Sequence, residues 1–181
     1  IPGMTVICPS DDVEARAAVK AAYELEGPVY MRFGRLAIPV INDNAGYKFE
    51  IGKGITLREG KDVTIIATGL CVGESIEAAK LLAEKGIDAE VINIHTIKPL
   101  DTELVTASAK KTGRVVTVEE HSVIGGLGEA VASALGESFP TPMIRIGVND
   151  TFGESGPAAE LLVKYGLTAA PIAERVECFL K

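Results

Sequence analysis

The sequence predicts an α/β fold in which a mostly parallel sheet carries helices on both faces. Short β-branched runs alternate with helical patterns along the whole chain, as is typical of strand–helix–strand units. With 181 residues, 47% of them hydrophobic, the chain can fill one ordinary domain, or a small domain with part of a second. The alternation of strands and helices is interrupted at residues 37–60, a stretch rich in Pro, Gly and Asn. This interruption indicates a domain boundary, and so a small domain with part of a second.

Two strands and one helix are expected before that break. Residues 4–8 and 29–33 are short apolar runs and predict the strands. Between them, Pro9-Ser10-Asp11-Asp12 supplies a turn and an N-cap for a helix that runs to about Glu24. The expected apolar face of this helix is formed by Val13, Ala17, Ala21 and Leu25.

A complete second domain is expected from residue 61 to residue 181, after a linker that carries a short strand or hairpin over residues 48–57. Its strands are predicted at residues 63–67, 89–94, 114–118 and 143–146. Its first helix is predicted to carry Val72, Ile76, Ala79 and Ala83 on one face. Another is predicted to open at the glycine turn 125–128, and the rest at residues 101–111, 158–164 and 172–180. Gly86 ends the first of these helices and Asp101 caps the one at residues 101–111.

Composition excludes several classes of partner. The net charge is −7, and no basic run exceeds Lys110-Lys111, so a nucleic-acid partner is not expected. The apolar runs are about five residues long, whereas a membrane-spanning helix needs roughly 20. Three widely separated cysteines suit neither a disulfide framework nor a thiolate metal site, so a reducing cytoplasm is expected.

Because the first residue is Ile1, we expect a truncated or processed chain.

Five segments, in one order along the chain, resemble transketolases and their split subunits. Two are similar to the end of the pyrimidine-binding domain: Ile1–Val6 with Pro9–Asp11, and Gly27–Arg35. Three are similar to the C-terminal domain: His95–Asp101, Glu119–Gly128 and Asp150–Gly156. The resemblance implies a remnant of the pyrimidine-binding domain at residues 1–36, a linker at 37–60, and a transketolase C-terminal domain at 61–181.

Two related families remain alternatives. Deoxyxylulose-phosphate synthase has a similar Arg-x-x-Arg segment, and the β subunits of 2-oxoacid dehydrogenase decarboxylases share the Glu-Glu and Gly-Gly segments. A third alternative, of another class, is a non-catalytic module that binds an anion or a partner protein.

The resemblance implies a part of a transferase of the pentose phosphate pathway. Transketolases use thiamine diphosphate and Mg²⁺ to move a two-carbon ketol unit between sugar phosphates, and the cofactor performs the difficult chemistry. By family comparison the cofactor-binding residues lie outside this chain. The chain alone is therefore expected to hold no cofactor and to be inactive. Its expected partners are a transketolase N-terminal subunit or domain that binds the diphosphate, and a second copy in a homodimer.

Arg35 is the candidate substrate-binding residue. A guanidinium can hold a phosphate through two parallel hydrogen bonds. By resemblance, Arg35 matches the arginine that transketolases use for the substrate phosphate; the other interpretation is a solvated arginine at a strand end. Arg32 should point in another direction and is interpreted as structural.

A titratable cluster, Glu119-Glu120-His121, precedes a glycine-rich turn. Gly125, Gly126 and Gly128 lead into a helix whose N-terminus could receive an anion, although the G-x-G-x-x-G spacing is absent. We therefore expect turn-stabilising hydrogen bonds or a subunit interface here, with anion binding by Glu120, His121 and the glycines as the alternative. No catalytic residue is predicted in the chain.

Three further residues are assigned structural roles. His95 is expected to be a hydrogen-bonded residue at a strand end, since no metal triad can be assembled around it. Asp101 is interpreted as a helix cap. Cys71 lies near a helix start, but no base is in evidence, so we assign it to packing.

Overall fold

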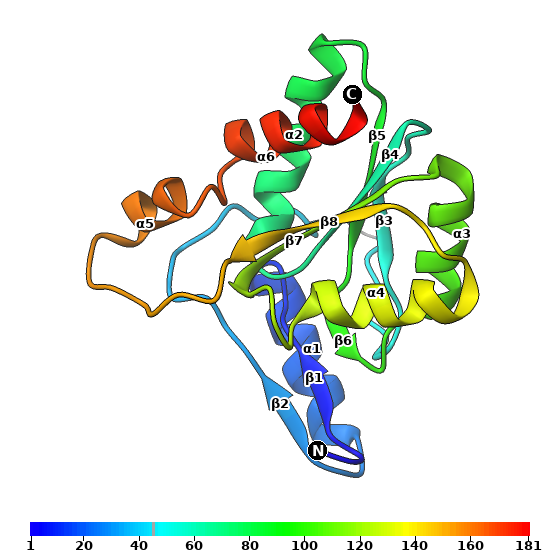
Figure 1. Cartoon of the computed structure of the whole chain (residues 1–181). Helices are drawn as coiled ribbons and strands as arrows, with labels where there is room; N and C mark the ends of the chain where they lie inside the picture. Colours follow the sequence, from blue (N-terminus) through cyan, green and yellow to red (C-terminus); the bar gives the residue numbers. More distant parts are fainter. Residues whose placement is uncertain (45) are drawn as a thin grey trace.

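The computed structural model describes residues 1–44 and 46–181, and its strands form two sheets (Figure 1). The smaller sheet has the order β2-β1-β6 and the larger one has the order β3-β5-β4-β7-β8. The strands are β1 (Thr5–Ile7), β2 (Val29–Met31), β3 (Ile55–Arg58), β4 (Val63–Ala67), β5 (Ala89–Asn93), β6 (Thr96–Lys98), β7 (Val115–Ser122) and β8 (Met143–Val148).

Helices cover both faces of the larger sheet (Figure 1). On one face α2 (Cys71–Glu84) packs against α6 (Ala169–Leu180), and on the other α3 (Thr102–Thr112) packs against α4 (Leu127–Ser138). Strands β5, β4, β7 and β8 are mutually parallel, and only β3 runs antiparallel to its neighbour β5. The predicted class, a mostly parallel sheet with helices on both faces, is confirmed.

Strand β4 shows why the larger sheet is buried on both sides. All five of its residues are buried, and successive side chains point to opposite faces. Ile65 packs in the core under α2 and α6, whereas Ile66 packs with Val105 and Leu127 under α3 and α4. A strand that is buried on both faces requires a near-continuous apolar run. This run made the strand predictable from the sequence.

Helix α1 (Asp12–Glu24) begins at the predicted cap, where the Asp11 carboxylate accepts a hydrogen bond from Glu14 N at 2.8 Å. The predicted apolar face is wrong. The buried residues of α1 are Glu14 and Ala18, and Leu25 is 37% exposed. The helix docks through the hydrogen-bonded Glu14 carboxylate, so the apolar stripe does not decide its orientation.

The first 36 residues are tied to the rest of the chain by β6, a strand that the sequence analysis missed. Strand β1 lies between β2 and β6 and pairs antiparallel with β6. Strand β6 has only three residues and Pro99 follows it directly, so the sequence offers no apolar run that marks it. The linker strand is β3, which overlaps the expected 48–57 range. The boundaries at residues 36 and 60 stay a prediction.

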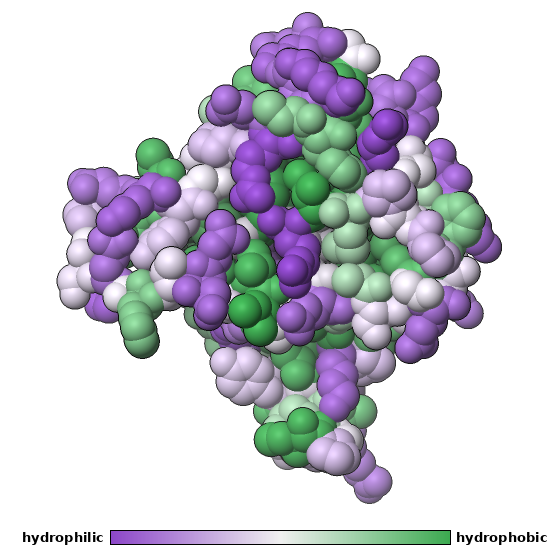
Figure 2. All heavy atoms as spheres, viewed as in Figure 1, coloured by the Kyte–Doolittle hydropathy of each residue, from purple (hydrophilic) through white to green (hydrophobic). Residues whose placement is uncertain are grey.

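Apolar surface is exposed around the smaller sheet and α1. Tyr23 is 92% exposed, Tyr30 is 53% exposed and Val19 is 51% exposed. Figure 2 shows apolar atoms at the end of the molecule where β1 and β2 lie. Strand β2 pairs only with β1 among the described residues, so its other edge is open there.

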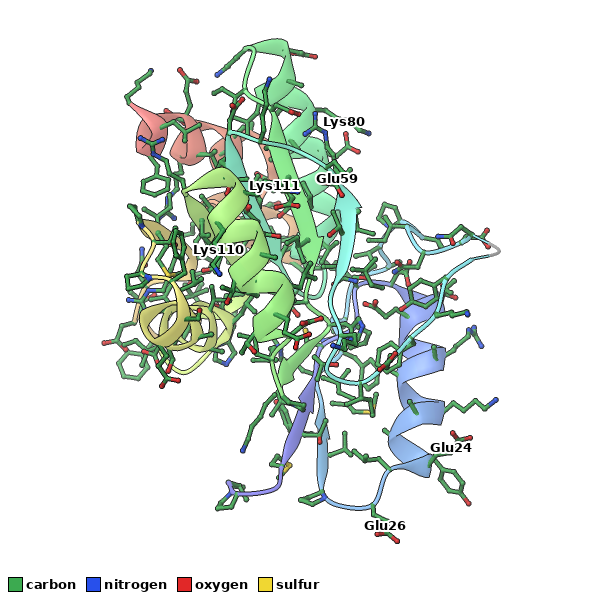
Figure 3. The ribbon with its side chains drawn as sticks, turned by 90° about the vertical axis from the view of Figure 1, so that its right-hand side faces the viewer. Glu24, Glu26, Glu59, Lys80, Lys110 and Lys111 are labelled. Carbon is green, nitrogen blue, oxygen red and sulfur yellow. The ribbon has the colours of Figure 1, made fainter. Side chains whose placement is uncertain are left out.

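A buried carboxylate at the amino end of the larger sheet is neutralised by a lysine. Glu90 of β5 is 1% exposed and accepts a hydrogen bond from Thr64 Oγ1 at 2.8 Å. Lys111 Nζ bonds to Glu90 and, at 2.7 Å, to Glu59 Oε2; Figure 3 shows Lys111 beside Glu59. A buried charge needs such a partner, and this group is a structural one.

Candidate substrate-binding site

A cavity of about 260 Å³ lies where the two sheets meet. Its walls come from the segments that follow β1, β2 and β4 and from β7, and they include Arg32, Arg35, Cys8, Thr68 and Glu120. These are the carboxyl ends of parallel strands from both sheets. Ligands of α/β proteins bind outside the carboxyl ends of such strands, so the position is that of a ligand site.

The end of β1 is held against the larger sheet by backbone contacts. Cys8 N donates to His95 O at 2.8 Å, and Thr68 Oγ1 donates to Cys8 O at 3.2 Å. Gly69 has φ +60°, and a Cβ placed there would lie 2.8 Å from Cys8 Sγ. Only glycine allows this approach without strain, because both the backbone conformation and the space exclude a side chain.

Arg32 joins the two sheets across the cavity. Its Nη1 donates to the carbonyl oxygen of Glu120 in β7, and its Nη2 donates to Cys8 Sγ at 3.3 Å. The backbone N–H of Arg32 also donates to Ile7 O at 2.9 Å. These contacts confirm the structural role expected of Arg32, but the expectation that it points away from Arg35 is wrong, because both arginines line this cavity.

Arg35 lines the same cavity and is exposed. Within residues 1–44 and 46–181, no hydrogen bond or ion pair engages its guanidinium. All of its N–H donors can therefore turn to a ligand, for which a planar guanidinium is suited if that ligand is an oxyanion. Its role toward a substrate stays a prediction.

The glycine-rich turn is capped by a carboxylate of the chain itself. Glu119 is fully buried, and its two oxygens accept hydrogen bonds from Leu127 N at 2.7 Å and Gly128 N at 2.8 Å. A Cβ at Gly126 would lie 2.0 Å from Glu119 Oε2, so this close approach requires glycine. Glu119 thus occupies the N-terminus of α4, the position where an external anion would bind.

Burial raises the pKa of Glu119, while the two backbone donors, His121 and Arg32 favour its charged form. The sequence analysis did not find this cap, since Glu119 precedes the helix by eight residues. The sequence pattern that could have revealed the cap is a glutamate in a buried strand, followed by a glycine-rich turn and a helix.

The other predicted residues of the cluster do not share one cavity. His121, Gly125 and Gly126 line a larger cavity of about 550 Å³ between the start of α4 and the smaller sheet, and Arg32 lines it too. Glu120 lines the smaller cavity with Arg35. Gly128 lies in the first turn of α4 and lines neither. Contact of the turn with another subunit stays a prediction.

The structural roles of Asp101 and Cys71 are confirmed. The Asp101 carboxylate caps α3 by accepting from Leu104 N at 3.1 Å, and it also accepts from Gly54 N at 3.0 Å. Cys71 is fully buried, and burial raises the pKa of its thiol. A thiolate is therefore disfavoured at this position.

His95 is fully buried at the carboxyl end of β5. Its Nδ1 lies 2.9 Å from Thr96 Oγ1, and its ring packs on Phe49 with the centroids 4.3 Å apart. Burial lowers the pKa of His95 to about 4, because the charged imidazolium would lose its hydration. The hydrogen-bonded interpretation is confirmed for Nδ1, whereas the buried Nε2 has no hydrogen-bond partner among the described residues.

The depressed pKa of His95 predicts a loss of stability in acid. The unfolded chain binds a proton near the ordinary pKa of 6.5, whereas the folded chain binds it only near pKa 4. Stability is thus fully present above pH 6.5 and is lost as the pH falls from 6.5 toward 4. Between pH 7 and pH 5 the free energy of unfolding should fall by about 2 kcal/mol from this group.

Urea unfolding of the wild type and His95→Gln at several pH values measures this loss. The variant should lack it. Equal pH slopes for the wild type and His95→Gln would contradict the assignment.

Two general features bear on the site. Among residues 1–44 and 46–181, no helix combines the length and the apolar character that crossing a bilayer requires. The same described ranges hold no group of three or more His, Cys, Asp or Glu side chains arranged to share a metal ion.

Comparison with known proteins gives concordant matches. The chain is 52% identical over 173 residues to a 6-deoxy-6-sulfo-D-fructose transketolase subunit from Clostridium sp. (strain MSTE9), covering 95% of this chain and 53% of that protein. It is 42% identical to 1-deoxy-D-xylulose-5-phosphate synthase 1 from Geobacter sulfurreducens, covering 99% of this chain and 29% of that protein.

A solved structure described as a split gene transketolase, inactive beta4 tetramer, superposes with a TM-score of 0.92 at 48% identity. The match covers 99% of this chain and 58% of that one, so the chain spans only about half the length of such subunits. Residues 52–172 match the family described as "Transketolase, C-terminal domain". The chain therefore belongs to the transketolase C-terminal domain family.

Proposed function

We propose that the chain is part of a transketolase that uses thiamine diphosphate to move a two-carbon ketol unit between sugar phosphates. The observation that carries the proposal is the cavity at the carboxyl ends of β1, β2, β4 and β7, with the unengaged Arg35 in its wall. Family membership and the split-subunit relatives support the reaction class.

Two groups that could have anchored the cofactor are already engaged by the chain itself. A diphosphate with Mg²⁺ needs free acidic ligands or helix N-terminal donors. Here the buried carboxylate of Glu14 is held by protein donors, and Glu119 itself fills the N-terminus of α4. We derive no step through the cofactor and propose that a partner subunit or another domain supplies its site.

The proposed partners are a transketolase N-terminal subunit or domain and a second copy of the chain. The name of the 52%-identical relative, a subunit, supports a partner. The solved relative is an inactive tetramer of β chains, which supports self-association without activity for a chain of this kind. In this proposal the isolated chain is inactive and supplies Arg35 together with architectural and dimer contacts.

The role of Arg35 is tested by reconstituting the chain with an N-terminal subunit and the rest of the pyrimidine-binding domain. Arg35→Gln should raise KM for a ketose phosphate at least about tenfold, since charge-assisted hydrogen bonds to the phosphate are lost. The KM for the dephosphorylated ketose should not change. Arg16→Gln, which removes an exposed arginine on α1, is the control. Equal effects on both sugars would contradict the phosphate role.

A second candidate is deoxyxylulose-phosphate synthase, which the 42%-identical relative supports. The same reconstituted complex discriminates the two: formation of 1-deoxy-D-xylulose 5-phosphate in place of ketol transfer would favour the synthase.

A further inference from the structure

We propose that the chain forms a two-fold symmetric dimer in which Phe152 of each copy enters the cavity of about 550 Å³ on the other copy. Phe152 lies on a strap, residues 150–156, that joins β8 to α5 (Ala158–Lys164). The inference rests on the self-association in the proposed function and deepens it, because it assigns the surfaces that meet.

The strap presents an aromatic ring to solvent. All of its residues are exposed, and Phe152 is 100% exposed. In Figure 1 the strap leaves the end of β8 and runs away from the sheets before it reaches α5. Glu154 pins it there, since its carboxylate accepts hydrogen bonds from Lys164 Nζ at 2.6 Å and Tyr165 OH at 2.9 Å. The ring is thus held where a partner can bury it, and such burial is favourable.

The cavity has the apolar lining that a phenyl ring needs. Each strand of the smaller sheet contributes one such residue: Val6, Tyr30 and Ile97. Ala130 of α4 lines the cavity from the other side. The cavity volume lies within the range of pockets that bind small organic ligands, so a benzyl side chain has room to enter.

The cavity carries positive charge that no carboxylate pairs with directly. Arg32 and Lys98 line it, and among residues 1–44 and 46–181 their cationic groups bond to carbonyl oxygens and a thiol. The acidic residues of the lining are engaged elsewhere: Glu119 by the N-terminus of α4, and Glu129 by Arg145 Nη1 at 3.7 Å. An acidic partner is therefore favoured.

The strap supplies the complementary charge. Asp150 lies two residues before Phe152 and is exposed, and its carboxylate has no hydrogen-bond or ion-pair partner within the described ranges 1–44 and 46–181. With the ring in the cavity of the other copy, this carboxylate approaches Lys98 and Arg32 there. The contact is consequently expected to weaken as salt screens these charges.

Both surfaces lie at the same end of the molecule, so one two-fold contact can fill both cavities. Ser122 of β7 pairs with Val148 of β8, and the glycine-rich turn and the strap therefore start side by side. Gly125 of that turn lines the cavity, and Ile124, between it and the strap, is 53% exposed. In an isologous interface each surface meets its complement twice, so Ile124 is expected near the symmetry axis, opposite its counterpart.

Sedimentation of the 181-residue chain tests the interface. The wild type should form dimers or larger assemblies built on them. Phe152→Ala should weaken dimerisation at least about 30-fold, since each dimer loses two buried rings. Lys98→Glu should weaken it about tenfold, because it places a carboxylate against Asp150. Val163→Ala removes another exposed apolar side chain, on α5, and should leave the assembly unchanged.

Cross-linking locates the symmetry axis. In a Cys178→Ser background, which removes the exposed native thiol, Ile124→Cys should give a cross-linked dimer with a short bismaleimide. Tyr23→Cys, at an exposed position on α1, is the control and should give none. Absence of the cross-link from Ile124→Cys, or wild-type dimerisation of Phe152→Ala, would overturn the interface.

These outcomes are distinct from those that test the proposed function. An assembly that Phe152→Ala leaves intact overturns this interface and keeps the proposed self-association, whereas a monomeric wild type overturns both. A Phe152-dependent dimer together with an inactive reconstituted complex keeps the interface and overturns the ketol transfer.

Discussion

Replacing Glu14 by Ala is expected to lower the free energy of unfolding by about 4 kcal/mol. The Glu14 carboxylate is fully buried and accepts hydrogen bonds from Ser10 N at 2.6 Å, Ser10 Oγ at 2.7 Å, Tyr47 OH at 2.7 Å and Asn93 Nδ2 at 2.8 Å. Truncation leaves these donors without their acceptor, and each buried donor without a partner costs about 1–3 kcal/mol. The network joins α1 to β5 and to the linker, so the loss should also loosen the cavity at Arg35.

Glu24 is the matched control for this change. It lies at the last turn of the same helix, is exposed, and points away from the body of the molecule in Figure 3. Glu24→Ala should change stability by less than about 0.5 kcal/mol. Urea unfolding followed by circular dichroism gives both values, and equal stabilities for Glu14→Ala and Glu24→Ala would show that the network contributes nothing.

Replacing Glu119 by Ala is expected to lower the free energy of unfolding by about 3 kcal/mol. The buried N–H groups of Leu127 and Gly128 lose their acceptor, and α4 loses the negative charge at its N-terminus. Hydrogen exchange should locate the effect, with the largest gain in exchange rate at these two amides. Unchanged amide protection would contradict the capping role.

Glu129 provides the control, since it lies in the first turn of the same helix but is exposed. Its carboxylate lies 3.7 Å from Arg145 Nη1 at the surface, a contact of small energetic value. Glu129→Ala should lower stability by less than about 1 kcal/mol.

The fold was predictable from the sequence where burial or capping requires a particular type of residue. Strands β4 and β5 are buried on both faces and show it as apolar runs, and Asp11 and Asp101 are read as caps from the residues that follow them. Strand β6 has three residues and ends before a proline, so its pairing with β1, between residues 89 and 92 positions apart, carries no local signal. Such long-range pairing depends on the tertiary structure.

The candidate site was predictable only in part. Arg35 stood out because a resemblance located it, but its neighbour Arg32 was judged by strand periodicity, and the strand ends before that periodicity applies. The sequence analysis assigned Glu14 no role, and an acidic residue on a helix is usually solvated. Its burial depends on donors from three separate segments, which no periodic pattern can indicate.

The central claim is that this chain completes a thiamine-diphosphate enzyme without itself holding the cofactor. Calorimetric titration with thiamine diphosphate and Mg²⁺ tests it most directly, first on the chain alone and then after addition of an N-terminal subunit with the rest of the pyrimidine-binding domain. We expect binding heat only in the complemented complex. Tight binding by the 181 residues alone would contradict the account.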